Sequence, residues 1–149
     1  MGGTQGYHAR AVTLLDSNVV IYASQQGSVH HAWARWIISH AVASDGAAVN
    51  VVCLAEICVG DEHPQTLGGR IRAWGVATLD VPVAAAEVCA AAYRQYRERR
   101  RGQSGKDSSR VPLPDFFIGA HAQVMGWSLA TADAGRIKTY FPTVRLIVP

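Results

Sequence analysis

The stretch AVTLLDSNVVIYA, residues 11–23, joins the two patterns that decide the fold class. Its first part, Ala11 to Leu15, is an apolar run that predicts a short buried strand. Asp16 or Ser17 can then cap a short helix that continues to about Ala23, because either side chain can accept a hydrogen bond from a free backbone N–H group. A strand followed directly by a helix is the unit from which parallel sheets are built.

The same succession of strand and helix recurs along the rest of the chain. We expect strands at residues 48–52, 76–81, 127–131 and 144–148. We expect helices at residues 29–43, through Glu56 to near Gly60, at 65–74, 82–101 and 114–125, with a short turn or helix at 133–140. In the first of these helices, helical spacing places on one face Trp33, Trp36, Ile37, His40 and Ala41. Residues 102–112 are rich in Gly, Ser and charge, which indicates a loop. The alternation predicts an α/β fold, with helices on both faces of a mainly parallel sheet.

The chain has 149 residues, of which 49% are hydrophobic. This length predicts one domain, residues 11–149, preceded by a flexible tail at residues 1–10. No apolar run is long enough to span a bilayer and the N-terminus lacks the apolar core of a signal peptide, so we expect a cytoplasmic protein without a membrane partner. Cys53, Cys58 and Cys89 lie in apolar contexts, which favours buried free thiols over a disulfide or a metal role.

Four carboxylates occupy comparable places in this pattern: Asp16, Glu56, Asp115 and Asp133. Asp16 and Asp133 follow predicted strands, and Glu56 lies just past another. Asp115 opens a predicted helix. Because the carboxyl ends of parallel strands and the helix N-termini that follow share one edge of the sheet, we expect the four side chains to meet there. Such carboxylates repel each other, so the site requires a bound cation or raised carboxyl pKa values.

Each acid also has a purely structural explanation. Asp16 could cap the helix that follows it, Asp115 could interact with a helix dipole, and Asp133 could be an ordinary turn residue. Glu56 is flanked by apolar residues, where a carboxylate is more often functional. One metal site explains the joint pattern better than four coincident structural roles. Ligands that are all oxygen favour Mg²⁺ or Mn²⁺ over zinc, and the sequence has no paired Cys or His at zinc spacing.

The net charge of +3 depends on one basic stretch. Residues 94–110 contain seven Lys and Arg against two acidic residues. A basic stretch beside an acidic metal site suits a phosphodiester substrate, so we predict that a nucleic-acid backbone contacts Arg97, Arg99, Arg100, Arg101, Lys106 and Arg110. The alternative is a solvated helix end, because arginines near a helix C-terminus also stabilise the helix dipole.

The segments LLDSNVVIYA, LAEICVG, PDFFIGAHA and TADAG, in this order, resemble the PIN-domain ribonucleases, and most closely the VapC-like toxins of type II toxin–antitoxin modules. The resemblance extends from about Thr13 to Val148. It implies a three-layer α/β/α sandwich on a parallel sheet. It also implies that the four acids are both the catalytic residues and the metal ligands, with Asn18 and Thr131 as supporting polar residues. The chain departs from the family at Ala132, where a basic residue is common, and at Gly119 and His121.

The resemblance implies an Mg²⁺-dependent endoribonuclease that hydrolyses RNA with a metal-activated water and is silenced by a cognate antitoxin. It also implies a homodimer, formed through the helix of Trp33 and Trp36 or through residues 65–74, although both tryptophans could equally be core residues. One alternative is a catalytically weak binding module of the same fold, which acts through protein or RNA contacts. Another is a phosphotransfer receiver domain. Such a domain requires a lysine near its final strand, and the only candidate is Lys138, which lies in a predicted turn.

Overall fold

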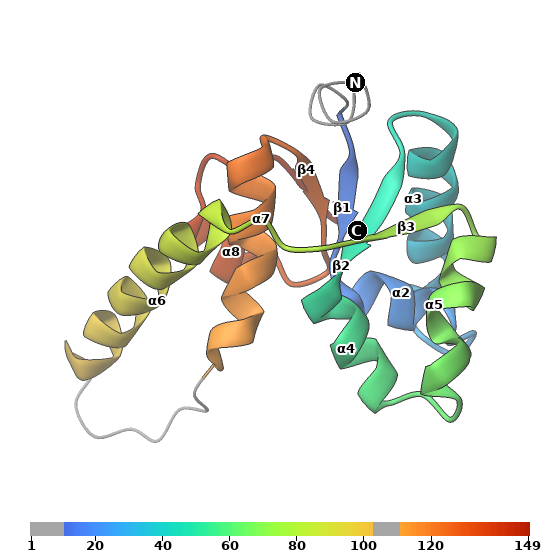
Figure 1. The fold of residues 1–149 in the computed structure, drawn as a ribbon, viewed down its shortest axis with the longest axis horizontal. Coiled ribbons are helices and arrows are strands. Elements are labelled where there is room, and N and C mark those ends of the chain that lie inside the picture. Colours follow the sequence, from blue (N-terminus) through green and yellow to red (C-terminus); the bar gives the residue numbers. More distant parts are fainter. Residues whose placement is uncertain (1–10, 103–110) are drawn as a thin grey trace.

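A five-stranded parallel sheet forms the centre of the protein (Figure 1). The computed structural model describes residues 11–102 and 111–149, so the predicted tail and most of the predicted loop lie outside the described residues. The strand order is β3-β2-β1-β4-β5, and every neighbouring pair is parallel. The strands are β1 (Thr13–Leu15), β2 (Ala47–Asn50), β3 (Val76–Leu79), β4 (Ser128–Ala130) and β5 (Leu146–Ile147). The predicted parallel α/β fold is confirmed.

Helices cover both faces of this sheet. Helices α2, α3 and α5 lie on one side and α6, α7 and α8 on the other, while α4 starts at the carboxyl edge of the sheet, where it contacts both α2 and α7 (Figure 1). The helices are α2 (Ser17–Ala23), α3 (His31–Ala43), α4 (Val51–Val59), α5 (Pro64–Ala73), α6 (Ala84–Gly102), the 3₁₀ turn η1 (Leu113–Phe116), α7 (Phe117–Met125) and α8 (Gly135–Tyr140). This arrangement is the predicted three-layer sandwich.

The strand order places a topological switch between β1 and β4. From β1 the chain moves outward through β2 to β3, and it then returns across the sheet to β4 and continues to β5. Connections that leave β1 and β4 in opposite directions open a crevice beyond the carboxyl ends of these two strands. Ligands of open parallel sheets bind in such crevices.

The core is built around the central strands. Leu14 and Leu15 of β1, Val49 of β2 and Leu129 of β4 are fully buried. Burial on both faces explains why these strands read as apolar runs rather than as alternating patterns. The carboxyl edge of the sheet is therefore attached to the close-packed core, which constrains the backbone that carries the side chains at that edge.

Two predicted elements differ from the structure for local reasons. The strand predicted at 48–52 ends at Asn50, because the Asn50 side chain accepts a hydrogen bond of 2.9 Å from the Cys53 N–H and so starts α4 two residues early. The helix predicted at 114–125 begins as the 3₁₀ turn η1 and becomes an α-helix only at Phe117. Asp115 consequently lies in a tight turn that precedes the helix.

The exposed face of α3 also differs from the prediction. Ala34, Ile37 and Ala41 face the core, whereas Trp36 is 57% exposed and stacks on His40 with ring centroids 5.1 Å apart. The predicted single stripe of Trp33, Trp36, Ile37, His40 and Ala41 is therefore wrong, because these residues divide between two faces of the helix.

The three cysteines are free, as predicted, but only Cys53 and Cys89 are buried, and Cys58 is half-exposed. Within residues 11–102 and 111–149, no helix combines the length and the apolar character that crossing a membrane requires.

Candidate active site

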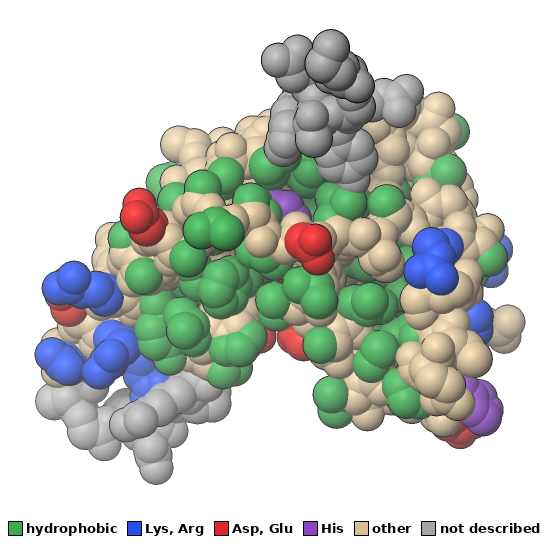
Figure 2. All heavy atoms as spheres, viewed as in Figure 1, with side chains coloured by type: hydrophobic (Ala, Val, Ile, Leu, Met, Phe, Trp, Pro, Cys, Tyr) green, Lys and Arg blue, Asp and Glu red, His purple; other side chains and the backbone are tan. Residues whose placement is uncertain are grey.

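All four predicted acids line one small pocket at the carboxyl edge of the sheet. The pocket has a volume of about 140 Å³. Figure 2 shows the hollow at the lower edge of the molecule, with acidic side chains at its head between the part that carries α6 and the part that carries α4 and α5. The lining residues are Asp16, Ser17, Asn18, Glu56, Pro114, Asp115, Ile118, Asp133 and Arg136. The structure thus places the four acids around one pocket, and their catalytic and metal-binding roles stay a prediction.

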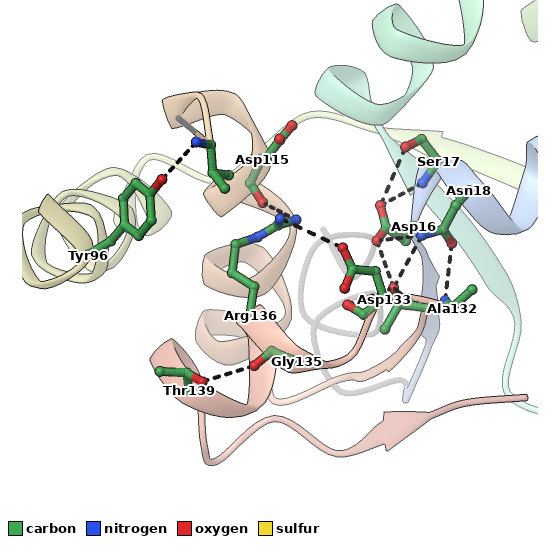
Figure 3. A network of polar contacts seen from close by, with 12 residues as sticks. Asp16, Ser17, Asn18, Tyr96, Asp115, Ala132, Asp133, Gly135, Arg136 and Thr139 are labelled. Atoms are coloured by element: carbon green, nitrogen blue, oxygen red, sulfur yellow. Dashed lines mark hydrogen bonds and ion pairs between the residues drawn. The ribbon is translucent and has the colours of Figure 1, made fainter. Parts of the chain in front are cut away.

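Asp16 is the most tightly held of the four acids. It directly follows β1, is only 8% exposed, and caps α2 by accepting a hydrogen bond of 2.8 Å from the Ser17 N–H. Its other carboxylate oxygen accepts a hydrogen bond of 2.8 Å from the Thr131 hydroxyl and a longer one of 3.4 Å from the Asn18 amide (Figure 3). Burial raises the Asp16 pKa, and the hydrogen bonds from Thr131 and Ser17 oppose the rise. Its capping role therefore coexists with its place in the pocket.

Thr131 and Asn18 connect the ends of β1 and β4. The Thr131 hydroxyl donates to Asp16 and accepts a hydrogen bond of 3.0 Å from the Asp133 N–H. The Asn18 side-chain oxygen accepts a hydrogen bond of 3.3 Å from the Ala132 N–H. Because each side chain contacts both segments, the two predicted supporting residues fix the crevice at the switch point.

Glu56 reaches the pocket from the second turn of α4. Burial of its carboxyl group raises the Glu56 pKa to about 7, and the neighbouring charges of Asp115 and Asp16 add to the rise. The positive charge of Arg136 opposes this rise without cancelling it. A carboxyl group that is costly to ionise beside two other carboxylates is expected in a site that takes up a cation.

Arg136 is the charged residue of the pocket lining that the sequence analysis did not predict. It lies on the short helix α8, three residues after Asp133, and its guanidinium reaches between Asp133 and Asp115 (Figure 3). Its Nη1 is 4.0 Å from the Asp133 carboxylate, and its Nη2 donates a hydrogen bond of 3.5 Å to the Asp115 backbone carbonyl. The guanidinium also lies over the Phe116 ring, 5.8 Å from its centroid. The sequence offered only a weak signal, a basic residue three positions after an acid, because Asp133 precedes α8.

The donor set suits a hard divalent cation. Four carboxylates and one arginine leave the pocket with an excess of negative charge, and carboxylate oxygens are the ligands that Mg²⁺ and Mn²⁺ prefer. Within the described part of the chain, however, no three His, Cys, Asp or Glu side chains are already close enough together to hold a metal ion. The Asp133 side chain is 66% exposed, so it has room to turn toward the other acids.

A comparison with known families decides the identity of the fold. The sequence profile of the PIN domain matches residues 13–141, which is most of the chain. The chain belongs to the PIN domain family. No curated protein matches its sequence.

Solved structures share the PIN fold of this chain at low sequence identity. A DNA-bound VapBC from Salmonella typhimurium is 17% identical, with a TM-score of 0.62, and covers 93% of this chain and 98% of its own. A toxin–antitoxin complex from Klebsiella pneumoniae is 20% identical, with a TM-score of 0.62 and coverage of 92% and 97%. VapC20 from Mycobacterium tuberculosis, described as a toxin that cleaves the sarcin–ricin loop, is 14% identical, with a TM-score of 0.58 and coverage of 89% and 98%. At these identities the likeness is one of fold.

The predicted RNA-binding arginines of this PIN domain lie apart from the acidic pocket. Arg97, Arg100 and Arg101, with two tyrosines, line a separate hollow of about 440 Å³ on α6. Arg99 lies over the Tyr140 ring of α8, with its guanidinium carbon 5.9 Å from the ring centroid. Lys106 and Arg110 lie outside the described residues. The structure thus brings the four acids together, whereas the α6 arginines form a second, basic surface.

The raised pKa values predict how the stability of the metal-free PIN domain depends on pH. A carboxyl that titrates near pH 7 when folded and near 4.5 when unfolded binds its proton more tightly in the folded state. The free energy of unfolding should therefore decrease as pH rises from about 4.5 to about 7, and should level off above that range. The slope is moderated because the Glu56 side chain remains in contact with water.

Denaturant titrations in EDTA across this pH range measure the effect. Glu56→Gln should flatten the decrease, whereas Glu62→Gln, which alters an exposed loop residue, should leave it unchanged. Equal slopes for the wild type and Glu56→Gln would show that the Glu56 pKa is the same in the folded and the unfolded state.

Proposed function

We propose that this PIN domain is an endoribonuclease that depends on Mg²⁺ or Mn²⁺ and hydrolyses RNA phosphodiester bonds with a metal-activated water. The observation that carries the proposal is the convergence of four carboxylates in one pocket at the switch point of the sheet. Carboxylates alone offer little to other classes of reaction, whereas around a divalent ion they serve phosphodiester hydrolysis. We assign both the metal-binding and the catalytic role to Asp16, Glu56, Asp115 and Asp133.

The residues of the pocket have different parts in this proposal. A bound divalent ion would lower the pKa of a water molecule and orient it toward the phosphate. Asp16 would hold its ligand oxygens in one orientation, because Thr131, Ser17 and Asn18 fix its carboxylate. Glu56 is partly protonated near pH 7 without a cation, so metal uptake at that pH should release a proton.

The basic surface on α6 supports a nucleic-acid substrate. Four arginines follow one another within the last two turns of this helix, and aromatic rings lie under two of them. Arginine binds phosphate and stacks on planar groups, so the surface suits an RNA strand. In the proposal the strand contacts Arg97, Arg99, Arg100 and Arg101, and also Lys106 and Arg110.

Replacing Arg99, Arg100 and Arg101 with alanine should weaken RNA binding and reduce its dependence on salt. If each arginine neutralises one phosphate, the slope of log affinity against log salt concentration decreases by up to about three units. The preferred cleavage sequence should hardly change, because phosphate contacts do not distinguish bases. Fluorescence anisotropy with a labelled single-stranded RNA at several salt concentrations provides the measurement. Arg35→Ala, on the opposite side of the sheet, is the control. An unchanged salt dependence in the triple variant would mean that this surface is only a solvated helix end and does not bind RNA.

A cognate antitoxin is the protein partner that we propose. Proteins with this fold occur in toxin–antitoxin complexes from Klebsiella pneumoniae and Salmonella typhimurium. The acidic pocket would attract a basic side chain from such a partner, and this side chain would compete with the metal for the carboxylates. Inhibition would then follow from the charge of the site.

We also propose that the protein forms a homodimer. On α3, Trp36 presents an exposed ring that stacks on His40, while Trp33 packs partly against the core. Exposed tryptophans are enriched at the centres of interfaces. The other candidate surface is α5, which is followed by the 41% exposed Trp74. Sedimentation at micromolar concentration, with and without Mg²⁺, measures this assembly.

The alternative function is a catalytically weak binding module of the same fold. The absence of a ready three-residue metal site among the described residues favours it, because turnover requires the acids to rearrange. Incubation of purified protein with RNA in Mg²⁺, in Mn²⁺ and in EDTA distinguishes the two functions. Cleavage that requires the divalent ion supports the nuclease, whereas RNA binding without cleavage in any of the three supports the binding module.

A further inference from the structure

Arg136 is the cationic side chain that lines the acidic pocket, and its contacts there leave much of its hydrogen-bonding capacity unused. A guanidinium carries five N–H donors. Its hydrogen bond to the Asp115 carbonyl is 3.5 Å long, and its approach to the Asp133 carboxylate is 4.0 Å. Both distances are at the outer limit for such contacts. The Nε atom of Arg136 is buried without a hydrogen-bond partner.

The arginine is nevertheless held in place. Its guanidinium lies over the ring of Phe116, which is fully buried and contacts the core residue Phe141. Its side chain is only 19% exposed. A positioned arginine that lacks short hydrogen bonds is preorganised for a ligand, since little side-chain freedom is lost when one binds.

The chemistry of the pocket identifies the ligand. A planar guanidinium matches the oxygen atoms of a phosphate in a bidentate manner. A phosphate that enters an acidic pocket needs cations on more than one side, and the carboxylates can provide a bound divalent ion but no positive charge of their own. We infer that Arg136 binds a non-bridging oxygen of the RNA phosphate to be cleaved, in the pocket that it shares with the four acids.

This inference rests on the proposed function for the source of the phosphate, and it adds a substrate-binding cation to the site. The competing explanation is that Arg136 only neutralises Asp133 and fixes the Asp115 turn. In that case the loss of its side chain would disturb the acids and weaken metal binding. If Arg136 binds phosphate, its loss removes a positive charge beside the acids, so metal binding should be retained or become tighter.

The test uses Arg136→Met, which keeps an apolar contact with Phe116 and removes the charge. Lys138→Met, an exposed position on the same helix, is the matched control for the loss of one positive charge. Calorimetry measures two affinities: that of the metal-free protein for Mn²⁺, and that of the Ca²⁺-loaded protein for uridine 5′-monophosphate, with uridine as the control without phosphate.

We expect Arg136→Met to bind Mn²⁺ at least as tightly as the wild type. We expect it to bind uridine 5′-monophosphate about 10- to 100-fold more weakly, as for a lost charge-assisted hydrogen bond. RNA cleavage should decrease on the order of 100-fold, mainly in kcat. Arg136→Lys keeps the charge without the planar guanidinium, so its nucleotide affinity and cleavage rate should lie between those of the wild type and Arg136→Met. It provides a second variant if Arg136→Met fails to fold.

Unchanged nucleotide affinity in Arg136→Met, or weaker Mn²⁺ binding in that variant, overturns the inference. A wild-type protein that binds the nucleotide through Arg136 but cleaves no RNA contradicts the proposed nuclease function and leaves the phosphate site standing. The two failures are therefore distinguishable.

Discussion

Replacing Asp16 with asparagine should abolish RNA cleavage while leaving the fold intact. Asparagine retains the acceptor oxygen that caps α2 through the Ser17 N–H, and its amide can donate to the Thr131 oxygen that now donates to the carboxylate. The fold therefore keeps the helix cap and the contact with Thr131, and loses only the longer hydrogen bond of 3.4 Å from the Asn18 amide. The substitution removes one negative ligand from the best-ordered position of the pocket, so divalent ions should bind weakly there.

We expect the cleavage rate of Asp16→Asn to decrease on the order of a thousand-fold or more, comparable with the loss of a principal electrostatic contact in other enzymes. The metal-free melting temperature should stay the same or rise, because burial disfavours the Asp16 carboxylate. Asp45→Asn makes the same chemical change at an exposed loop position and should cleave at the normal rate. A wild-type rate for Asp16→Asn at saturating Mg²⁺ would remove this residue from the site.

The fold was accessible from sequence because its central strands are buried on both faces. Such strands appear as apolar runs, and the helices between them have their own periodicity, so the parallel sheet follows from their alternation. The division of α3 into two faces was not accessible, because Trp36 and Ile37 are both apolar. Only the packing of Ile37 against the core, with Trp36 turned to solvent, distinguishes them.

The candidate site was partly accessible for the same reason. Asp16 and Asp133 follow strands, so the sheet itself brings them to one edge, and Thr131 lies where β4 ends. Arg136 belongs to a helix of six residues, too short to show a periodic pattern, and an arginine near a chain end usually indicates a solvated surface. Its role depends on the Phe116 ring beneath it, which reaches the site from a different part of the chain.

The packing around Gly119 explains why glycine occupies a position where the sequence departs from the family. It is buried in the first turn of α7, where the Phe141 ring packs directly against its backbone. A β-carbon at position 119 would lie 2.8 Å from Cγ of Phe141 and closer still to two other ring atoms. The ring cannot easily move away, because Phe141 is 1% exposed and contacts the buried Phe116 ring.

We therefore expect Gly119→Ala to destabilise the protein, although alanine has the higher helix propensity. Overpacking of a core by one methyl group costs up to about 3 kcal/mol, against a propensity gain of about 1 kcal/mol. The net loss of about 2 kcal/mol corresponds to a decrease in melting temperature of about 4–8 °C for a domain of this size. Thermal unfolding followed by circular dichroism measures it.

Two further variants determine whether the contact with Phe141 is the cause. Gly135→Ala introduces the same methyl group in α8 where no atom lies within 4 Å, so its melting temperature should stay the same or rise through the gain in helix propensity. In a Phe141→Leu background the smaller side chain leaves room for the methyl group, so Gly119→Ala should cost less there than in the wild type, and the double-mutant cycle should show coupling. Additive effects of the two substitutions would mean that Gly119 is required for another reason than the close approach of this ring.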